Sequence, residues 1–533
     1  MSRARRFGQA VSQPPRAVPP VQLRQVIRPG GASNSAMFEP VLSAWLRRVT
    51  AGLLLAFAVV GADAAAPRPN IVLVLADDLG YGDLACYGAK DLRTPHLDKF
   101  AAEGLRFTSC YAGHANCSPS RTALMTGRTP TRVGVRNWIP EESPVHLRRS
   151  EITIATLLQR AGYATCHSGK WHLNGDFNGP SQPQPGDHGF DHWFSTQNNA
   201  LPNHRNPENF VRNGKAVGKL EGYAGHLVAD EAIRWLASGR DQAKPFFLYL
   251  CFHEPHEPIA SDPKYAALYP SADPSYTAHH GNITQMDDAF GRLMAALDRQ
   301  GLRDNTLVFF TSDNGPAITP MHPHGSAGPL RDKKGSLWEG GIRVPGILRW
   351  PGKTRPGSVS DEPVCGVDLL PTLCAVAGLQ PPRDRKLDGA SFLPALEQKP
   401  VARATPLYWH FNRAIGEPKV ALRSGDWKIL ATLDKAPAPR TNDLTDEEER
   451  DFKAAELTGF ALYNLRTDIA EQTDLAASEP AKLAELKAQL QAKYREVRAE
   501  SPTWPAWKFT GSEGKKIIWP DYWKAKQPAA KKP

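Results

Sequence analysis

Short apolar segments alternate with amphipathic ones between residues 69 and 395. Apolar runs that predict β-strands cover residues 71–76, 163–167, 246–252, 307–311 and 344–350. Segments with helical spacing of apolar residues lie between them, at 95–103, 152–161, 229–237 and 286–300. Apolar strands that alternate with helices are typical of an α/β domain with a largely parallel sheet flanked by helices.

The pattern changes after residue 396. Apolar runs there predict a small antiparallel sheet, at residues 407–411, 420–422, 427–432 and 461–465. Leu483, Leu486, Leu490, Tyr494 and Val497 recur on one face of a predicted helix, which we expect to pack on this sheet. The sequence thus predicts three parts: an arm with a signal peptide at 1–66, a large domain at 67–395, and a smaller α+β domain with a tail at 396–533.

The N-terminal segment resembles an export signal. Residues 1–36 are rich in Arg, Pro, Gln and Ser, which indicates a disordered arm or translation from a start codon upstream of Met37. Two arginines then precede an apolar run at 49–60 and a small-residue stretch at 61–66, the order of a secretory signal peptide. The run is shorter than the roughly 20 residues that span a bilayer. We therefore expect an exported protein, periplasmic or secreted, without a stable membrane span.

Charge and cysteine content exclude some classes of protein. The chain has a formal net charge of +10, of which residues 1–66 carry +6, so about +4 remains for the rest and no nucleic-acid partner is implied. The seven cysteines are scattered and form no CxxC pair, so neither a disulfide scaffold nor a zinc site is expected. Their odd number means that at least one does not pair within the chain.

Four predicted strands of the large domain are followed by reactive side chains. These are Asp77 with Asp78, Lys170 with His172, His253 with His256, and Asp313 with Asn314. Because ligands of open α/β sheets bind beyond the carboxyl ends of the strands, we expect one site there. The acidic and amide residues of this set offer only oxygen ligands, which a hard cation such as calcium or magnesium prefers.

The segment CSPSRTALMTGR, residues 117–128, predicts a helix with chemistry at its start. Pro119 suits the first turn and Gly127 the end, so Cys117 should lie at the helix N-terminus. The exposed amides and Arg121, one turn on, favour a bound anion. Two alternatives remain on these residues alone: a buried structural cysteine, and a thiolate nucleophile facing a phosphate.

Taken together, these motifs resemble those of the formylglycine-dependent sulfatases of the alkaline phosphatase superfamily. The C-x-P-S-R segment, D-D, G-K-W-H, P-H-x-P, D-N-G and K-G-x-x-x-E-G-G occur in the expected order over about residues 69–500. The resemblance implies an alkaline-phosphatase-like sandwich. It also implies that a formylglycine-generating or sulfatase-maturating enzyme converts Cys117 to formylglycine (3-oxoalanine), whose hydrated aldehyde attacks sulfur.

The resemblance also assigns residues to roles. The implied calcium ligands are Asp77, Asp78, Cys117, Asp313 and Asn314. The implied catalytic residues are Cys117, Arg121, Lys170, His172, His256 and Lys334. Lys170 would neutralise charge around the formylglycine and sulfate, and His172 would be the base that helps to eliminate sulfate. His256 and Lys334 would contact the sulfate and stabilise the leaving alcohol, whereas His253 and Lys333 match less well.

The expected activity is that of a sulfuric ester hydrolase acting on sulfated carbohydrates, in particular sulfates of galactose or N-acetylgalactosamine. The stretch 174–218 is dense in Gly, Pro, Asn and His, and we expect it to form a long loop that influences substrate choice. Two rivals are a phosphodiesterase or phosphonate hydrolase of the same superfamily, and a non-catalytic carbohydrate-binding protein on the same scaffold.

Overall fold

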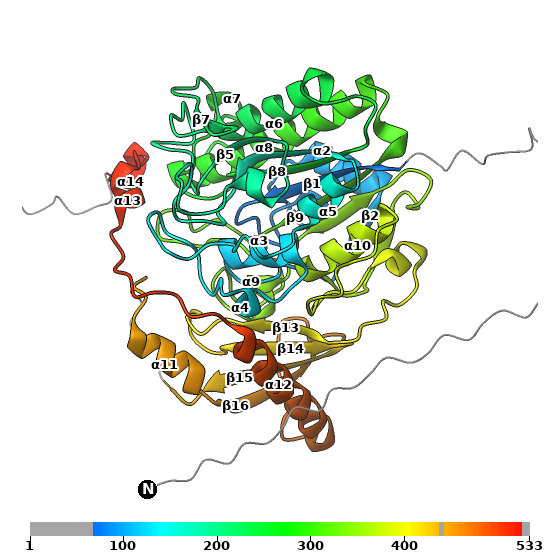
Figure 1. Ribbon diagram of the computed structural model, residues 1–533, viewed down its shortest axis with the longest axis vertical. Coiled ribbons are helices and arrows are strands. Elements are labelled where there is room, and N and C mark those ends of the chain that lie inside the picture. The colour runs from blue at the N-terminus through cyan, green and yellow to red at the C-terminus, as the bar shows by residue number, and fades with distance from the viewer. Residues whose placement is uncertain (1–67, 436–441, 525–533) are drawn as a thin grey trace, which may run out of the picture. The chain divides into compact units, whose positions relative to one another are not determined.

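A ten-stranded sheet forms the centre of the large α/β region (Figure 1). The computed structural model describes residues 68–435 and 442–524, which belong to one compact unit at 67–533. The predicted arm and signal peptide at 1–66 lie outside these residues. In spatial order the strands are β11 (Ser358–Ser360), β2 (Leu105–Phe107), β10 (Gly346–Arg349), β9 (Thr306–Ser312), β1 (Asn70–Ala76), β8 (Phe246–Cys251), β4 (Ala164–Lys170), β5 (His192–Thr196), β6 (Val211–Arg212) and β7 (Lys215–Ala216).

The central strands β9, β1, β8, β4 and β5 are all parallel, as the sequence predicts. Antiparallel strands flank them, because β10 pairs antiparallel with β9 and β6 pairs antiparallel with β5. The stretch 174–218 differs from its prediction. It contains β5, β6 and β7, so it is an edge of the sheet and not one long loop. These strands are short and interrupted by polar residues, which hid their periodicity.

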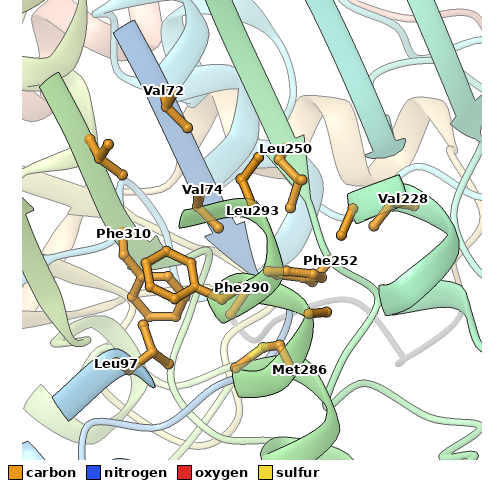
Figure 2. Packing of buried hydrophobic residues seen from close by; sticks show 14 of the residues in the cluster. Val72, Val74, Leu97, Val228, Leu250, Phe252, Met286, Phe290, Leu293 and Phe310 are labelled. Carbon is orange, nitrogen blue, oxygen red and sulfur yellow. The ribbon is translucent and has the colours of Figure 1, made fainter. Parts of the chain in front are cut away.

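Both faces of the sheet are buried under helices. Alternate side chains of β1 point to opposite sides, so Val72 and Val74 join one apolar cluster, whereas Leu73 and Leu75 join another. Figure 2 shows the first cluster, where Phe290 packs edge-to-face on Phe310. The first face is covered by α2 (Pro95–Glu103), α6 (Ala224–Arg234) and α8 (Pro274–Arg299). The second is covered by α5 (Ile154–Arg160) and α10 (Leu369–Val376).

Helix α3 (Cys117–Thr126) begins and ends where the sequence predicts. The side chain of Asn116 caps its N-terminus by accepting from the backbone N–H of Cys117 at 3.0 Å. Gly127 ends it in the left-handed conformation, with φ of +67°, which favours glycine. All ten residues of the helix are buried. The N-terminus of α3 is therefore held inside the protein.

The small sheet and its helix also match the prediction. Its antiparallel strands are β13 (Leu407–His410), β14 (Val420–Ser424), β15 (Trp427–Leu433) and β16 (Leu457–Asn464). One face packs on Leu490 and neighbouring residues of α12 (Pro480–Glu500). The other face packs through Trp409 on Tyr111 and on Ala123 of α3. The fold class is confirmed: a large, mostly parallel sheet flanked by helices, with a small antiparallel sheet and a helix.

Several short elements complete the described residues. A two-stranded sheet joins β3 (Cys110–Tyr111) and β12 (Val364–Cys365). The short helices are α4 (Pro130–Val133), α7 (Pro263–Ala266), α9 (Glu339–Ile342), α11 (Asp446–Ala454), α13 (Ser512–Lys516) and α14 (Asp521–Lys524). All seven cysteines lie in the described residues, and none is paired. Among the helices described, none combines the length and the apolar character needed to cross a membrane.

A buried ion cluster joins the small sheet to the large region. The ammonium of Lys428 on β15 lies 2.9 Å from a carboxylate oxygen of Glu339 on α9 and 2.9 Å from one of Glu471. All three side chains are fully buried. Lys428 also donates to the carbonyl of Leu337 at 2.9 Å. Removing the ammonium would leave Glu471 without this counter-charge, whereas Glu339 would keep its ion pair with Arg343 at 3.2 Å.

We expect Lys428→Met to lower the free energy of unfolding by about 3 kcal/mol, because breaking a buried ion pair leaves uncompensated charge. Lys435→Met is the matched control, since Lys435 forms an exposed pair with Asp451 at 3.1 Å. The control should change stability by less than about 1 kcal/mol. Urea denaturation followed by circular dichroism measures both. Equal, small effects would show that the buried cluster does not join the two sheets energetically.

Candidate active site

Neighbouring parallel strands deliver polar side chains to one edge of the large sheet. The order β9, β1, β8, β4 places four strand ends side by side. Asp77 and Asp78 follow β1, Lys170 ends β4, and Asp313 follows β9. The backbone is tied across these ends: the N–H of Asp313 donates to the carbonyl of Ala76 at 3.2 Å. The residues that the sequence placed after separate strands therefore meet at one site.

Two buried carboxylates lie at the centre of this edge, each beside a buried cation. Lys170 donates from Nζ to Oδ2 of Asp77 at 2.6 Å. Arg121, from the second turn of α3, donates to Oδ2 of Asp313 from Nε at 3.0 Å and from Nη2 at 2.7 Å. Its Nη1 donates to the carbonyl of Lys170 at 2.9 Å. Arg121 thus connects α3 to two strands of the sheet.

Asp78 is the carboxylate on the pocket side. Its backbone adopts φ of +67°, and its N–H donates to Oδ1 of Asp313 at 3.2 Å. The amide nitrogen of Asn314 donates to Oδ1 of Asp78 at 2.7 Å. Lys334 donates to Oδ2 of Asp78 at 2.8 Å, and Nε2 of His256 lies 3.7 Å from the same oxygen. Asp78 therefore joins residues from β1, β9 and the segment before α9.

The donor set fits a hard divalent cation. Oδ1 of Asp77 and Oδ1 of Asn314 are buried and accept no hydrogen bond from any described residue. One potential ligand atom each from Asp77, Asp78, Cys117 and His256 lies within 4.8 Å of the others. The carboxylate and amide oxygens of Asp77, Asp78 and Asn314 are ligands that calcium or magnesium prefers. The structure thus brings His256 close to the expected ligands, whereas Asp313 lies outside this tight group and is engaged by Arg121.

The electrostatics of the carboxylates also favour a cation. Burial and the neighbouring carboxylate of Asp77 raise the pKa of Asp313 to about 7, although Arg121 opposes the shift. Burial also acts to raise the pKa of Asp77, but the neighbouring side chains, Lys170 foremost, hold it well below its usual range. A divalent cation between these groups would relieve the repulsion that disfavours their joint ionisation.

Cys117 is the first residue of α3 and lines a pocket above the carboxylates. Burial raises the pKa of its thiol to about 12, with Lys170 and Lys334 opposing the shift. The thiolate is therefore a minor species at neutral pH.

The two candidate histidines are held in defined states. Burial, with Lys170 and Arg121 nearby, lowers the pKa of His172 well below its usual value, so its imidazole is neutral. Its Nε2 lies 3.1 Å from the carbonyl of Ile139, which makes Nε2 the protonated nitrogen and leaves a lone pair on the buried Nδ1. Burial lowers the pKa of His256 to about 4. Its Nδ1 contacts the carbonyl of Glu257 at 2.5 Å, so Nε2 faces the site.

The pocket has a volume of about 540 Å³, within the range of small-ligand sites. Cys117, His172, His256 and Lys334 line it. Asn198 and Asn199 do so too, and they lie in the stretch 174–218 that we expected to influence substrate choice. The lining also includes residues that the sequence did not identify as functional: Asn116, Asn137, Trp138, Phe411, Arg413, Asn442 and Glu513. These come from both sheets and from the C-terminal tail. No spacing within the sequence joins segments so far apart, so only the tertiary structure identifies them.

His253 and Lys333, the two weaker candidates, differ in their contacts from His256 and Lys334. His253 is buried away from the pocket, where its Nε2 lies 2.8 Å from the hydroxyl of Thr196. Lys333 lines the pocket, but its ammonium donates to the carbonyl of Ile318 at 2.6 Å and not to a carboxylate of the site. Lys334 and His256 are thus the members of these two pairs that reach Asp78.

Known proteins resemble this chain over most of its length. The family model described as Sulfatase matches residues 69–379, and that of the C-terminal region of N-sulphoglucosamine sulphohydrolase matches residues 330–449. N-acetylgalactosamine-6-sulfatase of Rattus norvegicus is 36% identical over 447 residues, covering 77% of this chain and 82% of the relative. Arylsulfatase A of Bos taurus is 39% identical over 360 residues, covering 62% and 68%.

A solved structure supports the same grouping. Ps i-CgsB in complex with k-i-k-neocarrahexaose superposes with a TM-score of 0.70 at 28% identity, covering 86% of this chain and 97% of that chain. The matches extend over the large sheet and the small one. The chain therefore belongs to the sulfatase family, with the alkaline-phosphatase-like fold, and is a sulfuric ester hydrolase.

Proposed function

We propose that this sulfatase cleaves sulfate monoesters of carbohydrates with a formylglycine made from Cys117 and with a bound calcium ion. One observation carries the proposal: Cys117 begins a buried helix at the base of the pocket, within 4.8 Å of the possible ligand atoms of Asp77, Asp78 and His256. A nucleophile, a cation site and fixed positive charge are thus concentrated at one point.

Asp77, Asp78, Asp313 and Asn314, with the modified Cys117, would hold the calcium ion. This choice is supported by the buried Oδ1 atoms of Asp77 and Asn314, which accept no hydrogen bond from any described residue, and by the oxygen ligands that these four side chains offer. When bound, the ion would stabilise negative charge on the nucleophile and on the sulfuryl oxygens. Arg121 and Lys170 act around it, because they fix the orientation of the carboxylates of Asp313 and Asp77.

The hydrated aldehyde would supply one oxygen to attack sulfur and a second whose collapse releases sulfate. The amides at the start of α3 and the positive end of its dipole would attract the sulfate anion. An enzyme of the formylglycine-generating or sulfatase-maturating kind is the partner that this proposal requires.

The chain's own residues divide the remaining work. Lys170 and Lys334 stay cationic. Burial is the largest single influence on their pKa and lowers it, but the neighbouring groups, led by Asp77 for Lys170 and by Asp78 for Lys334, together raise it. They would hold the charge that develops on the sulfuryl oxygens. His172 is neutral, and its Nδ1 lone pair would accept the proton that is released when sulfate is eliminated. His256 and Lys334 would contact the sulfate and stabilise the leaving alcohol.

A sulfated sugar is the substrate class that we propose. The rat relative is named for N-acetylgalactosamine 6-sulfate, and the solved structure Ps i-CgsB was determined with k-i-k-neocarrahexaose. The pocket supports a sugar ring, since it offers the aromatic side chain of Trp138 beside the amides of Asn198 and Asn199.

We also propose export to the periplasm or outside the cell, on the basis of the signal-like residues 49–66.

Mass spectrometry of the tryptic peptide 107–121 tests the nucleophile. In protein co-expressed with a formylglycine-generating enzyme, we expect an aldehyde at Cys117 that reacts with a hydrazide probe. Cys110 in the same peptide is the internal control and should remain an alkylatable thiol. An intact thiol at Cys117 in active protein would contradict the formylglycine mechanism and favour the thiolate alternative.

Elemental analysis tests the metal. We expect purified active protein to contain calcium, and chelation to lower both the Tm and the activity until calcium is returned, since ligand binding to the folded state stabilises it. Asp77→Asn should lose the ion and at least about 100-fold of kcat/KM. Asp83→Asn is the control, because Asp83 is a buried carboxylate that accepts from Gly80 and Ser326 outside the site. Retention of calcium in Asp77→Asn would contradict the assignment.

A pair of neighbouring lysines tests the charge stabilisation. Lys334→Met should lower kcat/KM for an aryl sulfate by about 10²–10³-fold, since it removes a cation aimed at the reacting group. Lys333→Met should change it by less than about tenfold, because this ammonium faces the carbonyl of Ile318. Equal losses would remove the distinction between the two lysines. The same assay with an aryl phosphodiester addresses the phosphodiesterase rival, which predicts the faster rate there.

A further inference from the structure

A C-terminal strap, residues 502–524, crosses the molecule after α12. Figure 1 shows it in red, leaving α12 beside the small sheet and ending at α13 and α14 near the large sheet. Trp507 exchanges two backbone hydrogen bonds with Leu444, at 2.8 and 2.9 Å. Further along, the N–H of Ile518 donates to the carbonyl of Pro202 at 2.7 Å. The strap is thus tied to both regions of the described structure.

The strap contributes Glu513 to the wall of the active-site pocket. This side chain is 9% exposed. Its Oε2 accepts from the amide nitrogen of Asn198 at 2.9 Å, and its Oε1 accepts from the backbone N–H of Asn199 at 3.1 Å. Each carboxylate oxygen can accept a second hydrogen bond, so Glu513 retains acceptor capacity towards the pocket. Within the described chain, it is the one carboxylic acid among the pocket-lining residues.

The strap also supports an aromatic surface in the same pocket. Phe509 packs edge-to-face on Trp138, with ring centroids 5.9 Å apart and an interplanar angle of 83°. Trp138 in turn lies 6.3 Å from the ring of His172. Its indole is partly exposed and lines the pocket. An aromatic face next to a hydrogen-bond acceptor is suited to a sugar ring, whose C–H surface stacks while its hydroxyls donate.

We propose that Glu513 determines substrate specificity by accepting a hydrogen bond from a hydroxyl or acetamido N–H of the sugar ring that carries the sulfate. The inference rests on the proposed function, because it names the recognition of the leaving group at that same site. Its negative charge disfavours sugars that carry a second anionic group near the strap. The preferred substrate is therefore a ring whose reacting sulfate is its only charge.

A role as an anchor of the strap does not alone explain why Glu513 lies in the pocket wall. The strap has other polar anchors outside the pocket, because Glu141 accepts from the hydroxyl of Ser512 at 3.2 Å and from Lys516 at 2.6 Å. Burial raises the pKa of Glu513, so holding an ionised carboxylate here costs free energy. Its two amide partners come from the loop after β5, and both also line the pocket. The three residues form one hydrogen-bonding surface facing the substrate.

The test compares Glu513→Gln with Glu141→Gln, the matched control that alters a strap anchor outside the pocket. For each variant we would measure kcat/KM with N-acetylgalactosamine 6-sulfate, with its 4,6-disulfate and with a small aryl sulfate. In Glu513→Gln, the ratio of the monosulfated sugar to the aryl sulfate should fall about tenfold, the effect of losing one charge-assisted hydrogen bond. The kcat/KM for the disulfated sugar should rise relative to that for the monosulfated sugar. Glu141→Gln should keep both ratios within about twofold.

A binding measurement separates this inference from the proposed function. Calorimetry with N-acetylgalactosamine 6-sulfate on Cys117→Ala protein needs no turnover, and adding Glu513→Gln should weaken Kd by about tenfold. A wild-type protein without activity on the aryl sulfate would overturn the proposed function, while the calorimetry still decides the role of Glu513. Unchanged ratios and an unchanged Kd would overturn the role of Glu513. A parallel loss on all substrates with a lowered Tm would also overturn it, and would leave Glu513 as an anchor.

Discussion

The ion pairs of Arg121 with Asp313 and of Lys170 with Asp77 are the interactions on which the rest of the site depends. All four side chains are buried at the ends of parallel strands, where an unpaired charge would be strongly destabilising. Because Arg121 belongs to α3, the pairing that makes these carboxylates tolerable also docks the helix on the sheet. The position of Cys117 at the start of that helix is therefore a consequence of charge compensation one turn further on.

The small sheet extends this arrangement to the other side of the pocket. It packs on α3 through Trp409, and Lys428 holds Glu339, five residues after Lys334. Phe411, which follows β13, lines the pocket itself. The C-terminal region thus acts as a second wall that sets where Lys334 can lie. The regions of both the large and the small sheet therefore contribute residues to the pocket.

Local patterns in the sequence predicted the parts of the fold that have strong periodicity. The parallel strands β1, β8 and β9 are buried throughout and contain continuous apolar runs, and the ends of α3 carry Pro119 and Gly127. Each of these elements could therefore be located from neighbouring residues alone. The edge strands β6 and β7 are two residues long and carry no such signal.

The residues of the site also fall into two groups, those that the sequence could locate and those that it could not. Asp77, Lys170 and Asp313 follow strands and could be found, because the carboxyl ends of parallel strands converge. Glu513 and Trp138 could not, because they reach the pocket through tertiary packing of a tail and a loop. His256 was also placed at this edge by the sequence, because it follows β8, but its approach to Asp78, with Nε2 3.7 Å from Oδ2, is shown only by the structure.

The complete burial of α3 bears on the order in which folding and the proposed modification of Cys117 would occur. Cys117 is 2% exposed, and the small sheet and the strap, both much later in the sequence, close over its surroundings. The modifying enzyme of the proposed function, itself a macromolecule, would have to reach Cys117 before α3 is buried in the core. Maturation and folding would therefore compete for the same segment, and the fraction of active molecules would be fixed by which is faster.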